Sequence, residues 1–102
     1  MKFGLKQNTI DKINAVFEKI SEIEEVVIYG SRAKGNYREG SDIDITIIGK
    51  NISYATLSKI NQEIDDLNTP YLFDISIFDK LESKEFINHI NRVGQTFYKK
   101  KQ

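Results

Sequence analysis

The stretch that decides the fold is YGSRAKGNYREGSDIDITIIG, which spans residues 29–49. It begins with a glycine–serine pair, Gly30–Ser31, and ends in an isoleucine-rich run that carries two aspartates, Asp42 and Asp44. Because side chains alternate between the two faces of a strand, both carboxylates share one face and the isoleucines share the other. Neighbouring carboxylates repel each other and are costly to bury without a partner, so we expect a metal ion to offset that cost.

Outward from this stretch, the hydrophobic spacing predicts helices and strands in the order α-β-β-α-β-α. The expected elements are helices over about 9–23, 53–67 and 83–97, and strands over 25–29, 42–48 and 71–78. Residues 30–41 are polar and rich in glycine, which favours a loop with one helical turn. The apolar stripe of the second helix includes Tyr54, and that of the last helix extends to Phe97.

This order of elements predicts one domain, residues 1–102, of the α/β or α+β class, in which helices cover a small mixed β-sheet. The segment between the second and third strands is long enough to be a crossover connection. The pattern alone leaves open whether these two strands are neighbours in the sheet.

A third aspartate, Asp74, interrupts the apolar run YLFDISIF of the third expected strand. If this strand lies beside the second, Asp74 comes close to Asp42 and Asp44, where each carboxylate pair would repel by about 4 kcal/mol at ~4 Å. Oxygen ligands of this kind suit Mg²⁺ or Mn²⁺, and two such ions can support phosphoryl transfer. The alternative is that the three carboxylates lie on an edge-strand face that is exposed to water.

The pair Gly30–Ser31 follows directly on an expected strand, where successive amides and a hydroxyl can bind an anion. The surrounding residues match neither the P-loop nor the G-x-G-x-x-G pattern. Arg32 and Lys34 in the same loop can neutralise phosphate charge, or they are solvated cations without a ligand.

The composition excludes several classes of site and argues against two kinds of partner. The chain has no cysteine and one histidine, so disulfides, cysteine nucleophiles and histidine-rich metal centres are excluded. Its 15 basic and 15 acidic residues cancel, so we expect neither nucleic acid nor a membrane surface as a partner. Without an apolar leader or a long apolar run, the expected location is the cytoplasm.

Taken together, Gly30–Ser31, the pair Asp42 and Asp44, and the later Asp74 resemble the polymerase-β-type nucleotidyltransferase superfamily. Within it, the segments GSRAKG and SDIDI resemble the minimal nucleotidyltransferase (MNT) domains. The resemblance implies that Gly30 and Ser31 hold the β- and γ-phosphates of a nucleoside triphosphate such as ATP. It also implies that Asp42 and Asp44 bridge two Mg²⁺ or Mn²⁺ ions. Asp74 would be the third metal ligand, holding the ion that lowers the pKa of the acceptor hydroxyl and acting as the base for this hydroxyl or positioning it.

This chain resembles the small stand-alone members of the family, which are typically antitoxins encoded beside a helical HEPN toxin. The resemblance therefore implies transfer of AMP from ATP to a hydroxyl, with a tyrosine of a HEPN partner as the acceptor. A chain of 102 residues offers little surface of its own to enclose an acceptor, so we expect a partner protein or self-association. The alternatives are a binding module that masks a partner without catalysis and, less well supported, an aminoglycoside nucleotidyltransferase.

Overall fold

Four strands form one mixed sheet in the computed structural model, which describes residues 1–101. The strands are β1 (Ile23–Tyr29), β2 (Ile43–Gly49), β3 (Phe73–Ile77) and β4 (Gln95–Lys99), in the spatial order β3-β2-β1-β4. β1 is antiparallel to both of its neighbours, whereas β2 and β3 are parallel. The question that the sequence left open is thereby answered, because the second and third predicted strands lie side by side.

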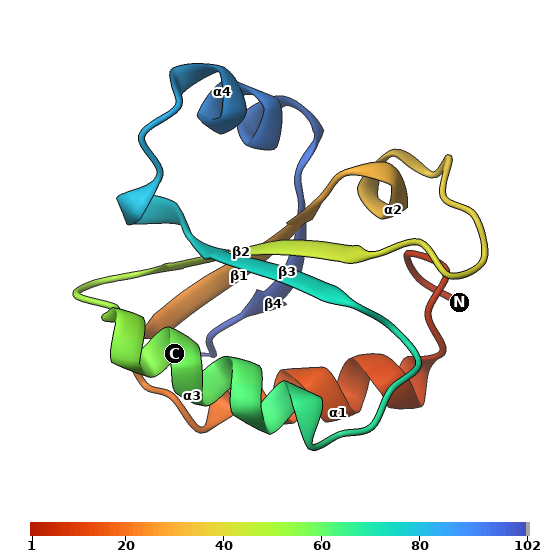
Figure 1. Ribbon diagram of the computed structural model, residues 1–102, viewed down its shortest axis with the longest axis horizontal. Coiled ribbons are helices and arrows are strands. Elements are labelled where there is room, and N and C mark those ends of the chain that lie inside the picture. Colours follow the sequence, from red (N-terminus) through yellow and green to blue (C-terminus); the bar gives the residue numbers. More distant parts are fainter. Residues whose placement is uncertain (102) are drawn as a thin grey trace.

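The helices divide between the two faces of this sheet (Figure 1). The longer helices α1 (Gln7–Glu18) and α3 (Tyr54–Asp65) cover one face, and the one-turn helix α2 (Ser31–Lys34) and α4 (Lys84–Val93) lie on the other. A short 3₁₀ helix, η1 (Phe78–Lys80), follows β3. The mixed α+β architecture expected from the sequence is confirmed.

The hydrophobic core lies between the sheet and the helices α1 and α3. Ile43, Ile45 and Ile47 of β2 are fully buried on this face, as the alternation of the strand predicted. Each of the two helices turns its apolar side toward the sheet, and Ile13 and Phe17 of α1 are also fully buried. This packing leaves the opposite face of β2 free for polar side chains.

The end of the chain differs from the prediction. The last helix was expected to continue to Phe97, but α4 ends at Val93 and β4 follows it directly. Phe97 is buried, as expected, yet from a strand that pairs with β1 rather than from a helix. Gly94 occupies the junction, and its N–H donates to the Ile90 carbonyl at 2.7 Å as the helix ends.

Two smaller expectations were also wrong. The first helix begins at Gln7 rather than Thr9 and ends at Glu18, and Ile23, expected to be its last residue, opens β1. Tyr54 was expected to be buried but is 64% exposed at the first position of α3, and its ring contacts the Lys80 ammonium group. Within residues 1–101, no helix is both long and apolar enough to cross a membrane.

Candidate functional site

The predicted carboxylates lie on the face of the sheet opposite the core. Asp44 of β2 pairs in register with Asp74 of β3, so the two occupy adjacent positions across neighbouring strands. Asp42 precedes β2 by one residue and shares the side-chain direction of Asp44. The structure therefore brings all three predicted aspartates to one face, with Asp44 between the other two.

Asp44 bears the electrostatic consequence of this arrangement. Its partial burial, followed by the negative charges of Asp74 and Asp42, raises the pKa of its carboxyl above the ordinary value of 3.8. Desolvation disfavours the ionised form, and like charges disfavour it further. A cation bound beside Asp44 would favour the ionised carboxylate and so oppose both effects.

Gly30 lies directly against Asp44. Its backbone has φ +75°, which L side chains rarely adopt, and a Cβ added there would lie within 2.4 Å of Asp44 Oδ2. No residue other than glycine allows the loop after β1 to approach the carboxylate this closely. The backbone at Gly30–Ser31 and the carboxylate of Asp44 thus form one continuous surface.

A buried tyrosine, which the sequence reasoning missed, completes the row of side chains. Tyr29 of β1 pairs in register with Asp44, and it is 5% exposed. Its ring packs edge-on against Phe86 and His89 of α4, with centroids 5.4 and 6.4 Å away. Burial and then the charge of Asp74 raise the pKa of its hydroxyl to about 12, so it stays protonated at neutral pH. Its place at the end of β1, just before Gly30, is the sequence feature that could have indicated a position in the site.

Hydroxyl groups extend the polar face beneath the carboxylates. Thr46 is fully buried on β2, two residues after Asp44, and Ser76 Oγ donates to Thr46 Oγ1 at 2.9 Å. Thr46 and Ser76 are partners in the β2–β3 register, as Asp44 and Asp74 are. The bond satisfies a buried hydroxyl and joins the two strands that carry the carboxylates.

The carboxylates share a face but do not form a closed metal cage. Over residues 1–101, no group of three or more His, Cys, Asp or Glu side chains is placed so that it alone could hold a metal ion. The arrangement nevertheless fits Mg²⁺, which is commonly held by one or two carboxylates together with water and substrate phosphates. The donors are all oxygen atoms, and the pKa of Asp44 is raised by burial and by the charges of Asp74 and Asp42, which a bound cation would oppose.

The two predicted loop cations lie in different environments. Lys34, the last residue of α2, is exposed and can reach a ligand in solvent. Arg32 is only 3% exposed, so the alternative that it is a solvated cation is wrong. Its guanidinium group donates to the main-chain carbonyls of Phe3 and Ser41, which gives it a structural role that the sequence did not indicate.

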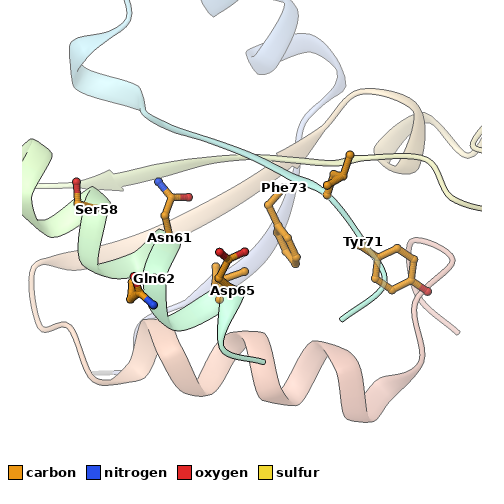
Figure 2. Close-up of a pocket in the computed structure, with 8 residues that line it drawn as sticks. Ser58, Asn61, Gln62, Asp65, Tyr71 and Phe73 are labelled. Atoms are coloured by element: carbon orange, nitrogen blue, oxygen red, sulfur yellow. The ribbon is translucent and has the colours of Figure 1, made fainter. Parts of the chain in front are cut away.

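One groove on the molecule lies away from the carboxylates. It has a volume of about 370 Å³ and runs between α3 and the start of β3, as Figure 2 shows. Asn61 and Asp65 line one side, and Tyr71 and Phe73 line the other. Phe73 and Asp74 are consecutive in β3, so their side chains point to opposite faces of the sheet. The candidate site is therefore an open face rather than this groove.

A sequence model of one family, described as polymerase beta, nucleotidyltransferase, matches residues 11–102. This match includes every element that forms the site. The chain belongs to the polymerase beta nucleotidyltransferase family. No curated protein matches it closely enough to add a more specific relative.

Solved structures of this nucleotidyltransferase fold include toxin–antitoxin complexes. One, a toxin–antitoxin structure with AMP-PNP, has a TM-score of 0.71 at 18% identity, over 94% of this chain and 75% of that one. A second is the tri-AMPylated Shewanella oneidensis HEPN toxin in complex with its MNT antitoxin, with a TM-score of 0.69 at 14% identity, over 94% and 74% of the two chains.

A third similar structure is a protein from Sulfolobus solfataricus described as a nucleotidyltransferase. It has a TM-score of 0.54 at 21% identity, and the match covers 94% of this chain and 91% of that one. Identities this low show a shared fold and no more. The polymerase-β-like fold and the resemblance to MNT antitoxins, both expected from the sequence, are confirmed at that level.

Proposed function

We propose that this nucleotidyltransferase domain transfers AMP from ATP to a hydroxyl of a partner protein. The observation that carries the proposal is the position of Asp44, which is in register with Asp74 and in contact with the backbone at Gly30. A phosphate-binding backbone and a row of carboxylates on one open face are what nucleotidyl transfer requires. We include the whole chain, residues 1–102, in this single domain and place it in the cytoplasm.

The binding step uses the loop after β1. Gly30 and Ser31 offer amides and the Ser31 hydroxyl to the β- and γ-phosphates, because the first amides of a helix have no acceptor within it. Lys34, exposed at the end of α2, supplies a positive charge to the same triphosphate. For Arg32, whose guanidinium group donates to main-chain carbonyls, the contacts support a structural role instead.

The chemical step joins the acceptor oxygen to the α-phosphorus of ATP and breaks the bond from that phosphorus to the bridging oxygen, so that pyrophosphate leaves. Asp42 and Asp44 would hold Mg²⁺ or Mn²⁺, which when bound stabilises the charge that develops on the phosphoryl oxygens. Asp74 orients the acceptor hydroxyl and accepts its proton. Its exposed position on the edge strand β3 leaves it within reach of a group carried by another molecule.

A second protein is the acceptor that the site fits best. The carboxylates lie on an open face, and an attacking hydroxyl must therefore be delivered and enclosed from outside. Similar folds occur in complexes of HEPN toxins with MNT antitoxins, one of them with an AMPylated toxin. We therefore propose a HEPN-type toxin as the partner, a tyrosine as its acceptor residue, and an antitoxin role for this chain.

Intact-mass spectrometry tests the proposal. The protein is incubated with ATP, Mg²⁺ and the product of the neighbouring reading frame, and both chains are then weighed. A gain of roughly 329 Da per AMP on the partner is expected. An Asp44→Asn preparation is the control and should transfer nothing. Tight association without a mass change, equally strong for Asp44→Asn, would contradict catalysis and favour a masking module.

A further inference from the structure

Arg32 is a buried cation whose hydrogen bonds are all made to the main chain. Its Nε and Nη2 donate to the Ser41 carbonyl at 3.0 and 2.8 Å, and its Nη1 donates to the Phe3 carbonyl at 2.9 Å. The fork of the guanidinium group thereby connects two segments that are far apart in the sequence. With 3% of the residue exposed, these carbonyls take the place of water around the charge.

Two aromatic rings hold the same guanidinium group in place. Its Cζ lies 5.3 Å from the ring centroid of Tyr37 and 4.9 Å from that of Tyr71. These are cation–π distances, and an arginine stacked on rings loses orientational freedom. Figure 2 shows the Tyr71 ring projecting from the segment before β3 toward the N-terminal turn that contains Phe3.

The N-terminal turn, residues 2–5, packs against the loop that contains Tyr37. Phe3 and Gly4 have φ of +57° and +73°, and the main-chain bonds between Lys2 and Leu5, at 3.2 and 2.9 Å, close the turn. A Cβ on Gly4 would come within 2.4 Å of Tyr37 Cε2. The turn therefore lies tightly against the loop and offers Arg32 a fixed carbonyl.

Arg32 and two of its partners, Ser41 and Tyr71, adjoin segments of the candidate site. Arg32 itself follows Ser31, and Ser41 precedes Asp42. Tyr71 lies three residues before Asp74. The guanidinium group of Arg32 thus fixes three segments relative to one another. They are the loop after β1 that contains Gly30 and Ser31 (the phosphate loop), the start of β2, and the segment before β3.

We propose that Arg32 is a positioning residue that sets the spacing between the phosphate loop and the carboxylates, rather than a ligand of the nucleotide. This inference rests on the proposed transfer reaction. It gives the planar fork a role that positive charge alone cannot fill, because a lysine cannot bond the Phe3 and Ser41 carbonyls in the same plane. A displacement of about 1 Å at a reacting centre can lower a rate by about 100-fold.

The conservative variant Arg32→Lys separates position from charge. We expect its kcat for AMP transfer to fall by about 10- to 100-fold, while its KM for ATP changes by less than about threefold. A charge contact to the phosphates predicts instead that Arg32→Lys is near the parent and that Arg32→Gln mainly raises KM. The matched control is Arg92→Lys, the same exchange at an exposed position of α4, which should leave both constants unchanged.

A second readout needs neither substrate nor metal. Hydrogen exchange of the backbone amides of residues 36–42 should accelerate in Arg32→Lys and stay unchanged in Arg92→Lys, because only the first loses the bonds to the Ser41 carbonyl. Tyr71→Leu, which keeps the arginine and removes one ring, should accelerate the same amides to a smaller extent. If exchange of these amides is unchanged in Arg32→Lys, the positioning role is overturned, whatever the activity.

Binding of Mn²⁺ with a non-hydrolysable ATP analogue distinguishes failure of this inference from failure of the proposed function. We expect the parent to bind both and Arg32→Lys to bind Mn²⁺ about tenfold more weakly at saturating analogue, since Asp42 is displaced. A parent that binds but never transfers AMP contradicts the proposed reaction and leaves the Mn²⁺ comparison to decide the role of Arg32. Equal Mn²⁺ affinity in the two proteins, or a parent that binds neither ligand, overturns the inference.

Discussion

Burial and two neighbouring carboxylates make the ionised form of Asp44 costly and raise the pKa of its carboxyl. Asp44 is half-buried and has a second carboxylate in register and a third two residues away. Its neighbours on the core face of β2, Ile43 and Ile45, are fully buried and hold the strand in place. The strand can therefore keep an ionised Asp44 in an unfavourable position, which is what a cation site requires before its ligand arrives.

The pH dependence of stability should reveal this cost in protein freed of metal by EDTA. The pKa of Asp44 is raised in the folded state, so the folded state binds more protons than the unfolded state once the pH rises past the ordinary value of 3.8. The free energy of unfolding therefore falls as the pH rises from 3.8 through the raised pKa. Asp44→Asn should be more stable than the parent in urea at pH 7, and this advantage should shrink at pH 3. Glu82→Gln, at an exposed position outside the helices and strands, should show no such advantage; an equal gain there would contradict the explanation.

Gly30 and Gly35 form a natural pair for testing the contact with Asp44. Both have positive φ, +75° and +85°, but a Cβ on Gly30 would meet Asp44 Oδ2, whereas one on Gly35 would meet nothing within 4 Å. Gly35→Ala should cost about 1–2 kcal/mol of unfolding free energy from backbone strain alone. Gly30→Ala should cost more and also abolish AMP transfer, as measured by urea unfolding and intact mass. Equal effects of the two substitutions would show that the contact does not matter.

At the level of elements, the sequence predicted β2 and the carboxylate face well because a period of two is unambiguous when Asp and Ile alternate. It failed at β4 because Phe86, Ile90, Val93 and Phe97 continue a helical spacing across Gly94. A strand as short as Gln95–Lys99 has too few residues to show a period of its own. Residues 95–99 form a strand because they pair with β1, and pairing between distant segments cannot be recognised from the local sequence.

The missed strand also helps to place the phosphate loop. Gln95 Nε2 donates to the Ala33 carbonyl at 2.5 Å, which connects the start of β4 to α2. The sequence indicated a phosphate contact or a solvated cation for Arg32 and missed its structural contacts for a similar reason, since its acceptors at Phe3 and Ser41 are 29 and 9 residues away. Residue types could be predicted to lie in the site, but contacts between distant segments could not.

The junction between α4 and β4 should tolerate no side chain at Gly94. A Cβ there would lie 2.4 Å from the Ile90 carbonyl oxygen and 2.6 Å from Val27 Cγ1. We expect Gly94→Ala to lower the free energy of unfolding by about 1–3 kcal/mol, because the helix must move off β1. Asn91→Ala, at an exposed position of the same helix, should be neutral or slightly stabilising. Urea denaturation of both variants provides the measurement, and equal stabilities would contradict the close packing.

The hydrophobic core and the carboxylates lie on opposite faces of the sheet. The helices α1 and α3 and one side of the sheet form the core, and the other side carries the carboxylates, α2 and α4 (Figure 1). Most of the buried apolar side chains therefore lie on the face opposite the carboxylates. This separation allows substitutions at the carboxylates to change the balance between the empty and the bound protein without disrupting the fold.

A reversal of the order of melting temperatures should follow from this separation. In EDTA, Asp44→Asn should melt above the parent, because it lacks the repulsion. With Mg²⁺ and a non-hydrolysable ATP analogue at about 100 times its Kd, the parent should gain about 2.7 kcal/mol, or on the order of 10 °C. Asp44→Asn should gain much less and then melt below the parent, since it has lost a ligand of the metal. Thermal unfolding of both proteins in both buffers measures the reversal. If the two gain equally on adding Mg²⁺ and the analogue, the carboxylate does not hold the cation, and Asp44 is excluded from the binding site.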